Sequence, residues 1–99
     1  MHSRTMKYIV RILCPEKQSN DKTLYTNLVK EAIEKKLSSL FQYKEKQEDF
    51  YGVKITYETK GSFVKERTLV TLGECVEKAL YSILSQDPKV DYCVRQKEQ

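Results

Sequence analysis

The spacing of apolar residues changes in the middle of the chain, and this change limits the folds that the chain can adopt. Over residues 21–41, apolar side chains recur every three or four positions, which predicts one long amphipathic helix. Over residues 51–57, they recur at every second position, which predicts a strand with one buried face. Both elements can bury their apolar sides if a layer of helices packs on a sheet.

Two further strands are predicted at the ends of the chain. Residues 7–14 are rich in β-branched and aromatic side chains, and the run stops at Pro15. Residues 89–95 alternate in the same way and follow Pro88, which ends the preceding helix. These two segments are therefore expected to belong to the same sheet as residues 51–57.

The middle of the chain is predicted from turn and cap signals. The charged segment 42–49 is interpreted as a linker or a frayed helix end. Residues 59–62 form a predicted turn in which Gly61 supplies a positive φ. A third strand is expected over residues 63–72, although its register is open to a shift of one residue. Thr71 and Glu74 have the spacing of a capping box and are expected to open the second helix.

The predicted order of elements is β-α-β-β-α-β. This is the ferredoxin-like order of an α+β two-layer sandwich, with two helices on one face of a four-stranded antiparallel sheet. A length of 99 residues suits one small domain. We expect a flexible N-terminal tail at residues 1–6, a single α/β domain at residues 7–95 and a flexible C-terminal tail at residues 96–99.

Composition and charge indicate the class of protein. The chain is 39% hydrophobic and 32% charged, which excludes a disordered chain, and no apolar run is long enough to cross a bilayer. The N-terminal residues lack the pattern of a secretory signal, so an intracellular protein, cytoplasmic or nuclear, is expected. A net charge of +4 permits binding to phosphates or acidic proteins without requiring it.

Few residues are suited to catalysis or to metal binding. The only histidine is His2, so a serine or cysteine nucleophile has no histidine base in the predicted domain. Cys14, Cys75 and Cys93 lack the spacing of a zinc site and are interpreted as reduced, partly buried thiols. Cys14, next to Pro15, is the one nucleophile candidate. We therefore predict a protein without enzymatic activity, cofactor or metal.

One face of the predicted sheet is basic. If Tyr8, Val10 and Ile12 pack under the helices, alternation places other residues on the opposite face. That face would carry cations and a few apolar side chains, which are Lys7, Arg11, Lys54, Arg95, Ile9, Leu13, Thr56 and Cys93, with Arg67 joining from the third strand. Three interpretations remain open, which are phosphate binding, docking of a protein or a second copy, and solubility alone.

Two stretches resemble the signature strands of RNA-recognition motifs. Lys60, Gly61, Phe63 and Val64 are similar to the Lys-Gly-aromatic-Gly-Phe-Val strand of that family, with one residue missing. The strand that begins at Tyr8 is similar to its first signature strand. The resemblance implies RNA binding, with Phe63 offering a surface on which a base can stack.

Residues 20–33 resemble a stretch in the small assembly subunits of archaeal and eukaryotic RNA polymerases. The matching positions are Asp21, Thr23, Leu24, Asn27, Leu28, Glu31 and Ala32. This resemblance implies a scaffold subunit that pairs with a partner. The order of elements is also similar to that of small α/β protein subunits of RNase P, which implies RNA binding through a basic surface.

These observations lead to one function hypothesis and one alternative. The hypothesis is a non-enzymatic binding module associated with RNA or ribonucleoprotein. Its predicted binding residues are Lys7, Arg11, Lys54, Phe63, Arg67 and Arg95. The alternative is a protein–protein assembly subunit or homodimerising module that docks through the sheet face or an edge strand.

Overall fold

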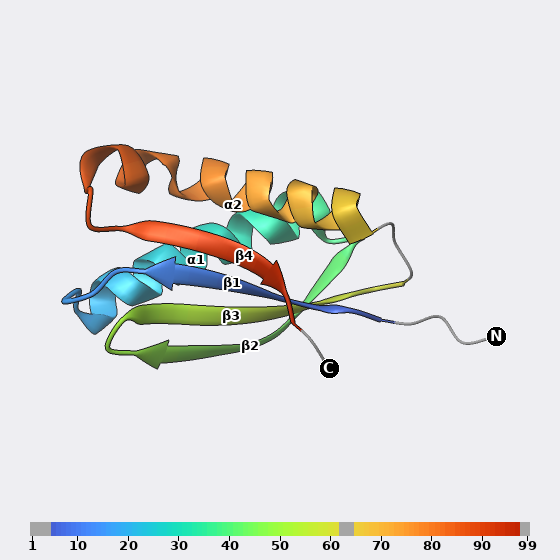
Figure 1. Cartoon of the computed structure of the whole chain (residues 1–99), viewed down its shortest axis with the longest axis horizontal. Coiled ribbons are helices and arrows are strands. Elements are labelled where there is room, and N and C mark those ends of the chain that lie inside the picture. The colour runs from blue at the N-terminus through green and yellow to red at the C-terminus, as the bar shows by residue number, and fades with distance from the viewer. Residues whose placement is uncertain (1–4, 62–64, 98–99) are drawn as a thin grey trace.

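The computed structural model of the chain describes residues 5–61 and 65–97 and contains two helices and one sheet (Figure 1). The elements in chain order are β1 (Lys7–Leu13), α1 (Ser19–Leu37), β2 (Phe41–Asp49), β3 (Gly52–Thr59), α2 (Lys65–Gln86) and β4 (Asp91–Gln96). The sheet has the order β2-β3-β1-β4, and every neighbouring pair of strands is antiparallel. The predicted α+β two-layer arrangement of two helices on a four-stranded antiparallel sheet is confirmed.

Two predictions for the middle of the chain are wrong. Residues 42–49 are not a linker but most of β2, and the hairpin turn lies at Phe50 and Tyr51 rather than at residues 59–62. β2 lies at the edge of the sheet, and all but one of its side chains are exposed or half-buried. Because an edge strand can be almost wholly polar, the apolar alternation that identifies a buried strand is missing here.

The expected third strand is also wrong, because α2 already begins at Lys65. Thr71 and Glu74 therefore lie inside the helix and do not open it. The β-branched residues of 63–72 suggested a strand, but the buried side chains Thr68, Leu72 and Val76 recur at four-residue spacing. Burial of that helical stripe outweighs the weaker local preference for a strand.

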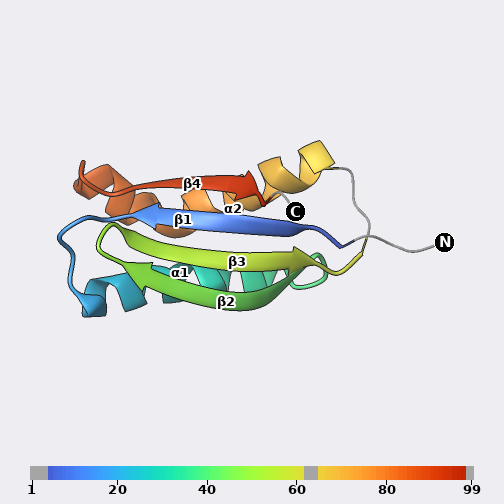
Figure 2. The ribbon, with the colours of Figure 1, turned by 60° about the horizontal axis from the view of Figure 1, so that its bottom comes forward.

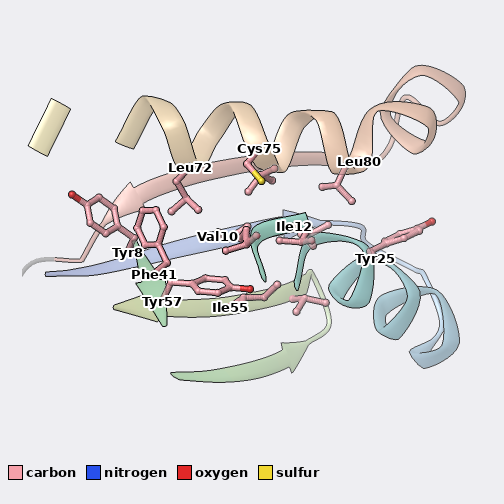
Figure 3. Close-up of a cluster of buried hydrophobic side chains, with 14 of the residues drawn as sticks. Tyr8, Val10, Ile12, Tyr25, Phe41, Ile55, Tyr57, Leu72, Cys75 and Leu80 are labelled. Carbon is pink, nitrogen blue, oxygen red and sulfur yellow. The ribbon is translucent and has the colours of Figure 1, made fainter. Parts of the chain in front are cut away.

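The core lies between the sheet and the two helices (Figure 3). Tyr8, Val10 and Ile12 of β1 are fully buried there, as the predicted register of this strand requires. The helices add Leu72 and Leu80 from α2, among others. The remaining buried side chains of this core include Val53, Ile55, Tyr57, Tyr25, Val29, Ile33 and Phe41. The face of β1 and β3 that was predicted to lie under the helices is confirmed.

The turn between β2 and β3 is held by one aspartate and one glycine. The Asp49 carboxylate accepts hydrogen bonds from the backbone N–H groups of Tyr51 (2.8 Å) and Gly52 (2.9 Å). Gly52 has a φ of +148°, and a Cβ at this position would lie 2.0 Å from the backbone oxygen of Ile12. Only glycine fits this contact, so Gly52 fixes how closely β3 approaches β1.

No helix in the described part of the chain is long and apolar enough to cross a membrane.

Candidate functional site

The face of the sheet that turns away from the helices is called the open face here. Figure 2 looks onto it, with both helices behind the sheet. In the antiparallel register, Arg11 of β1 lies opposite Lys54 of β3 on one side and Cys93 of β4 on the other. One row along, Ile9 lies between Thr56 and Arg95. Since directly opposite residues in an antiparallel pair share a face, the three inner strands bring the predicted cations together.

Three of these cations surround one depression. This basic hollow has a volume of about 290 Å³, and its lining residues are Ile9, Arg11, Asp49, Lys54, Cys93 and Arg95. A neighbouring, larger depression of about 540 Å³ shares Ile9, Lys54 and Arg95 with it and extends toward β2. The carboxylate in the basic hollow is that of Asp49, so cationic side chains outnumber acidic ones in its lining.

Arg11 uses only part of its guanidinium group within the described residues. Its Nη2 lies 3.0 Å from both carboxylate oxygens of Asp49. The hydrogen bond from Arg11 lowers the pKa of the Asp49 carboxyl group below its usual range. Nη1 of Arg11 is buried and has no hydrogen-bond partner among the residues that the structure describes. A buried N–H group without an acceptor is costly, and Nη1 is closed to solvent, so a ligand from solution reaches it only if the surrounding side chains move.

Lys54 and Arg95 form no ion pair with any of residues 5–61 and 65–97. Lys54 is half-buried and Arg95 is exposed, so both ammonium and guanidinium groups can meet a ligand from solvent. Lys7 lies at the end of the same face, where its neighbour Glu58 lies 3.9 Å from Lys44 Nζ. On this face, Glu58 therefore lies beside Lys7 at one end, and Asp49 lies in the basic hollow beside Arg11.

The open face offers little apolar surface. Ile9 is 4% exposed and Thr56 is 6% exposed, so neither presents apolar surface to solvent. No aromatic side chain of β1 or β3 lies on this face, since Tyr8 and Tyr57 pack under the helices. The face is therefore suited to charge–charge contacts and not to stacking of bases or to apolar docking.

Two predicted site residues do not contribute to this face in the described structure. Arg67 lies on α2, in the helix layer, and is exposed there. The prediction that it would join the sheet is wrong, because it depended on a strand over residues 63–72. Phe63 lies outside the described residues.

An exposed aromatic pair at the hairpin turn was not predicted. Phe50 is 67% exposed, Tyr51 is 61% exposed, and their ring centroids lie 5.2 Å apart. Lys22 reaches the turn from α1, and its Nζ donates to the backbone oxygen of Asp49 at 2.8 Å. Asp49 and Gly52 stand three positions apart around this turn, a pairing of turn-favouring residues that could have located it.

The three cysteines differ in exposure. Cys14 and Cys75 are buried, and burial raises the pKa of both thiols, which keeps them protonated and poorly nucleophilic. Cys93 is exposed on β4 and lines the basic hollow. Among the described residues, no group of three or more histidine, cysteine or acidic side chains could hold a metal ion.

Comparison with known proteins adds no identification. No protein-family model matches the chain, and no curated protein shows significant sequence similarity to it.

Proposed function

We propose that this protein is a non-enzymatic RNA-binding module that holds the phosphate backbone on the open face of its sheet. The observation that carries the proposal is the basic hollow, where Arg11, Lys54 and Arg95 face one another and Asp49 supplies the opposing charge. The choice of RNA over DNA rests on the resemblance to RNA-recognition motifs. The order β-α-β-β-α-β, with β1 and β3 at the centre, supports assignment to the ferredoxin-like arrangement that this family shares.

The hollow would act on the backbone and not on the bases. Lys54 and Arg95 would hold the phosphate oxygens, while Arg11 beside them adds positive charge to the hollow. Binding would release counterions from the RNA and would weaken as salt is added. Because the central strands present no aromatic ring on this face, we expect little preference among base sequences.

A docking function for the same face is less well supported. Apolar docking requires exposed apolar area, and Ile9 and Thr56 of the open face are buried. The negative charge of a phosphate matches the positive charge that dominates the lining of the basic hollow.

The experiment is a binding titration with a fluorescently labelled single-stranded RNA at low salt. The Lys54→Glu and Arg95→Glu variants reverse charges in the basic hollow. Arg67→Glu makes the same charge change on α2, away from the open face, and is the matched control. Each hollow variant is expected to weaken binding about 10-fold or more, because a charge reversal removes one phosphate contact and adds repulsion.

The control separates a specific face from general attraction to a basic protein. Arg67→Glu is expected to weaken binding by no more than about 2-fold, through net charge alone. Equal losses in all three variants would place the binding surface elsewhere. Absence of binding by the unmodified protein at low salt would reject the proposed function.

A further inference from the structure

The two edges of the sheet differ in how well they are protected against pairing with another strand. The outer strand β2 carries the run Lys44–Asp49, in which five of six residues are charged, and its register shifts between Tyr43 and Glu45. Charged side chains and bulges are the devices that block edge-to-edge pairing. The other edge strand, β4, pairs with β1 without a register shift and has Cys93 and Val94 at its centre. Of the two edges, β4 is the one that can accept a further strand.

We infer that β4 pairs with β4 of a second copy of this chain, so that the two sheets become one. The inference does not rest on RNA binding, although Arg95 belongs to both the basic hollow and this edge. It begins with the backbone of β4. The Lys97 N–H donates to the Lys7 oxygen at 2.8 Å, so odd-numbered residues of this segment turn their backbone groups toward β1. By alternation, Tyr92, Val94 and Gln96 turn theirs toward the free edge.

One side-chain contact marks the free edge. The Asp91 carboxylate accepts a hydrogen bond from the Tyr92 N–H at 2.8 Å, which is one of the groups that a second strand would otherwise satisfy. Asp91 therefore stands at the edge itself, at one end of β4. Arg95 stands on the same face four residues further along and forms no ion pair with the described residues.

The charges of β4 are self-complementary in one register. An antiparallel pair centred on Cys93 places Asp91 opposite Arg95 of the second copy, and the two-fold symmetry repeats this contact at the other end. Tyr92 then lies opposite Val94 of the second copy on the helix side, where both residues are already half-buried. In the dimer, the Asp91 carboxylate would release the Tyr92 N–H and accept hydrogen bonds from the Arg95 guanidinium of the second copy. The Tyr92 N–H would then donate to the backbone of the second strand.

Neighbouring registers are less favourable. A shift of two residues in one direction brings Lys89 opposite Arg95 of the second copy, which places like charges together. A shift in the other direction brings Cys93 opposite Arg95 and Asp91 opposite Lys97, which lies beyond the end of β4 at Gln96. After a shift of one residue, the outward-facing backbone groups of one strand would lie opposite residues whose own groups face inward, so the two strands could not form hydrogen bonds with each other.

The favoured register makes a geometric prediction for Cys93. Since the outward backbone groups belong to even-numbered residues, the two copies of Cys93 form a non-hydrogen-bonded pair, whose Cα atoms lie about 4.5 Å apart. This separation lies within the range that a disulfide can span. Cys14 and Cys75 are buried, so an added thiol reagent reports on Cys93.

The experiment combines cross-linking with a charge exchange. In the full chain, the oxidant diamide is expected to accept two electrons from a pair of Cys93 thiols, each of which loses its proton, and to leave a disulfide-linked dimer on a non-reducing gel. Cys93→Ser should remove this band. Sedimentation over about a hundredfold range of protein concentration gives the monomer–dimer equilibrium without cross-linking.

The charge variants test the register. Asp91→Arg and Arg95→Asp each place like charges opposite one another. Each should therefore raise the dissociation constant of the dimer at least about 10-fold. The double variant restores opposite charges and should recover the dimer. Urea denaturation of each variant shows that the fold is retained. Asp91→Arg leaves every cation of the basic hollow in place, so loss of the dimer and loss of RNA binding can be distinguished.

A protein that is monomeric at all concentrations would overturn the inference. A dimer that persists in both single variants, or that forms without a Cys93 cross-link, would show that copies associate through another surface.

Discussion

The two faces of β1 have the same backbone and opposite environments. Tyr8, Val10 and Ile12 are fully buried under the helices, whereas Lys7 and Arg11, which alternate with them, border the open face. The covered face holds the molecule together through apolar burial, whereas Lys54 and Arg95 of the open face form no ion pair with the described residues. Substitutions on the covered face should therefore change stability most, and substitutions of Lys54 and Arg95 should change binding.

The largest effect on stability is expected at Gly52, where β3 approaches β1 most closely. Gly52→Ala places a Cβ 2.0 Å from the Ile12 oxygen at a φ of +148°, so β3 has to move away from β1. We expect a loss of several kcal/mol in the free energy of unfolding, measured by urea denaturation.

Gly73→Ala is the matched control for that substitution. Gly73 lies inside α2, and a Cβ there would meet no atom within 4 Å. The same chemical change should raise stability by about 0.5–1 kcal/mol, because alanine loses less backbone entropy in a helix. Similar destabilisation by both substitutions would contradict the close approach of β3 to β1.

The next prediction compares two isoleucines of β1. Ile12 is enclosed by the core, and Ile12→Ala should cost about 3–5 kcal/mol. Ile9 lies on the open face and lines the basic hollow with Arg11, Lys54 and Arg95, whose long side chains can move into the space left behind. Ile9→Ala should therefore cost about 2 kcal/mol or less. Equal losses in urea denaturation would mean that the open face is as tightly packed as the core.

A smaller effect, dependent on pH, is expected from Asp49. Arg11 lowers the pKa of this carboxyl group in the folded protein, so the ion pair stabilises the fold above the usual carboxyl pKa of about 4. That contribution is lost as the pH falls through the lowered pKa. Asp49→Asn should be less stable than the unmodified protein at neutral pH, and the difference should shrink in acid.

Glu48→Gln is the control for the pH series. Glu48 directly precedes Asp49 in β2 and forms an exposed ion pair with Lys46, whose Nζ lies 3.0 Å from Glu48 Oε2. Exposed pairs of this kind contribute little to stability. A pH dependence as strong in Glu48→Gln as in Asp49→Asn would show that the Arg11–Asp49 pair has no special weight.

The fold is most predictable from the sequence where burial leaves a periodic pattern. Alternation in β1 and β3 predicts the correct covered face, and it correctly places Arg11 and Lys54 together on the opposite face. β2 was not predicted, because apolar residues do not alternate along an exposed edge strand. The start of α2 escaped because its β-branched residues favour a strand, and the helical stripe that outweighs them depends on burial against the sheet.

The error in β2 also hid part of the site. With residues 42–49 interpreted as a linker, the turn signal of Asp49 and Gly52 was missed, and the contact of Asp49 with Arg11 across β3 was missed with it. Contacts between strands depend on register, and register depends on where the turn lies. Arg67 was misplaced because residues 63–72 were predicted as a strand, and a helix presents different residues to the sheet than a strand does.

The central claim is that the basic hollow binds phosphate, and its most direct test is the salt dependence of RNA binding. If Arg11, Lys54 and Arg95 each neutralise one phosphate, the logarithm of the binding constant should fall with the logarithm of salt concentration with a slope of about −2. Lys54→Glu should reduce the magnitude of that slope by about 0.7 or more. A slope near zero, or a slope that Lys54→Glu leaves unchanged, would contradict the claim.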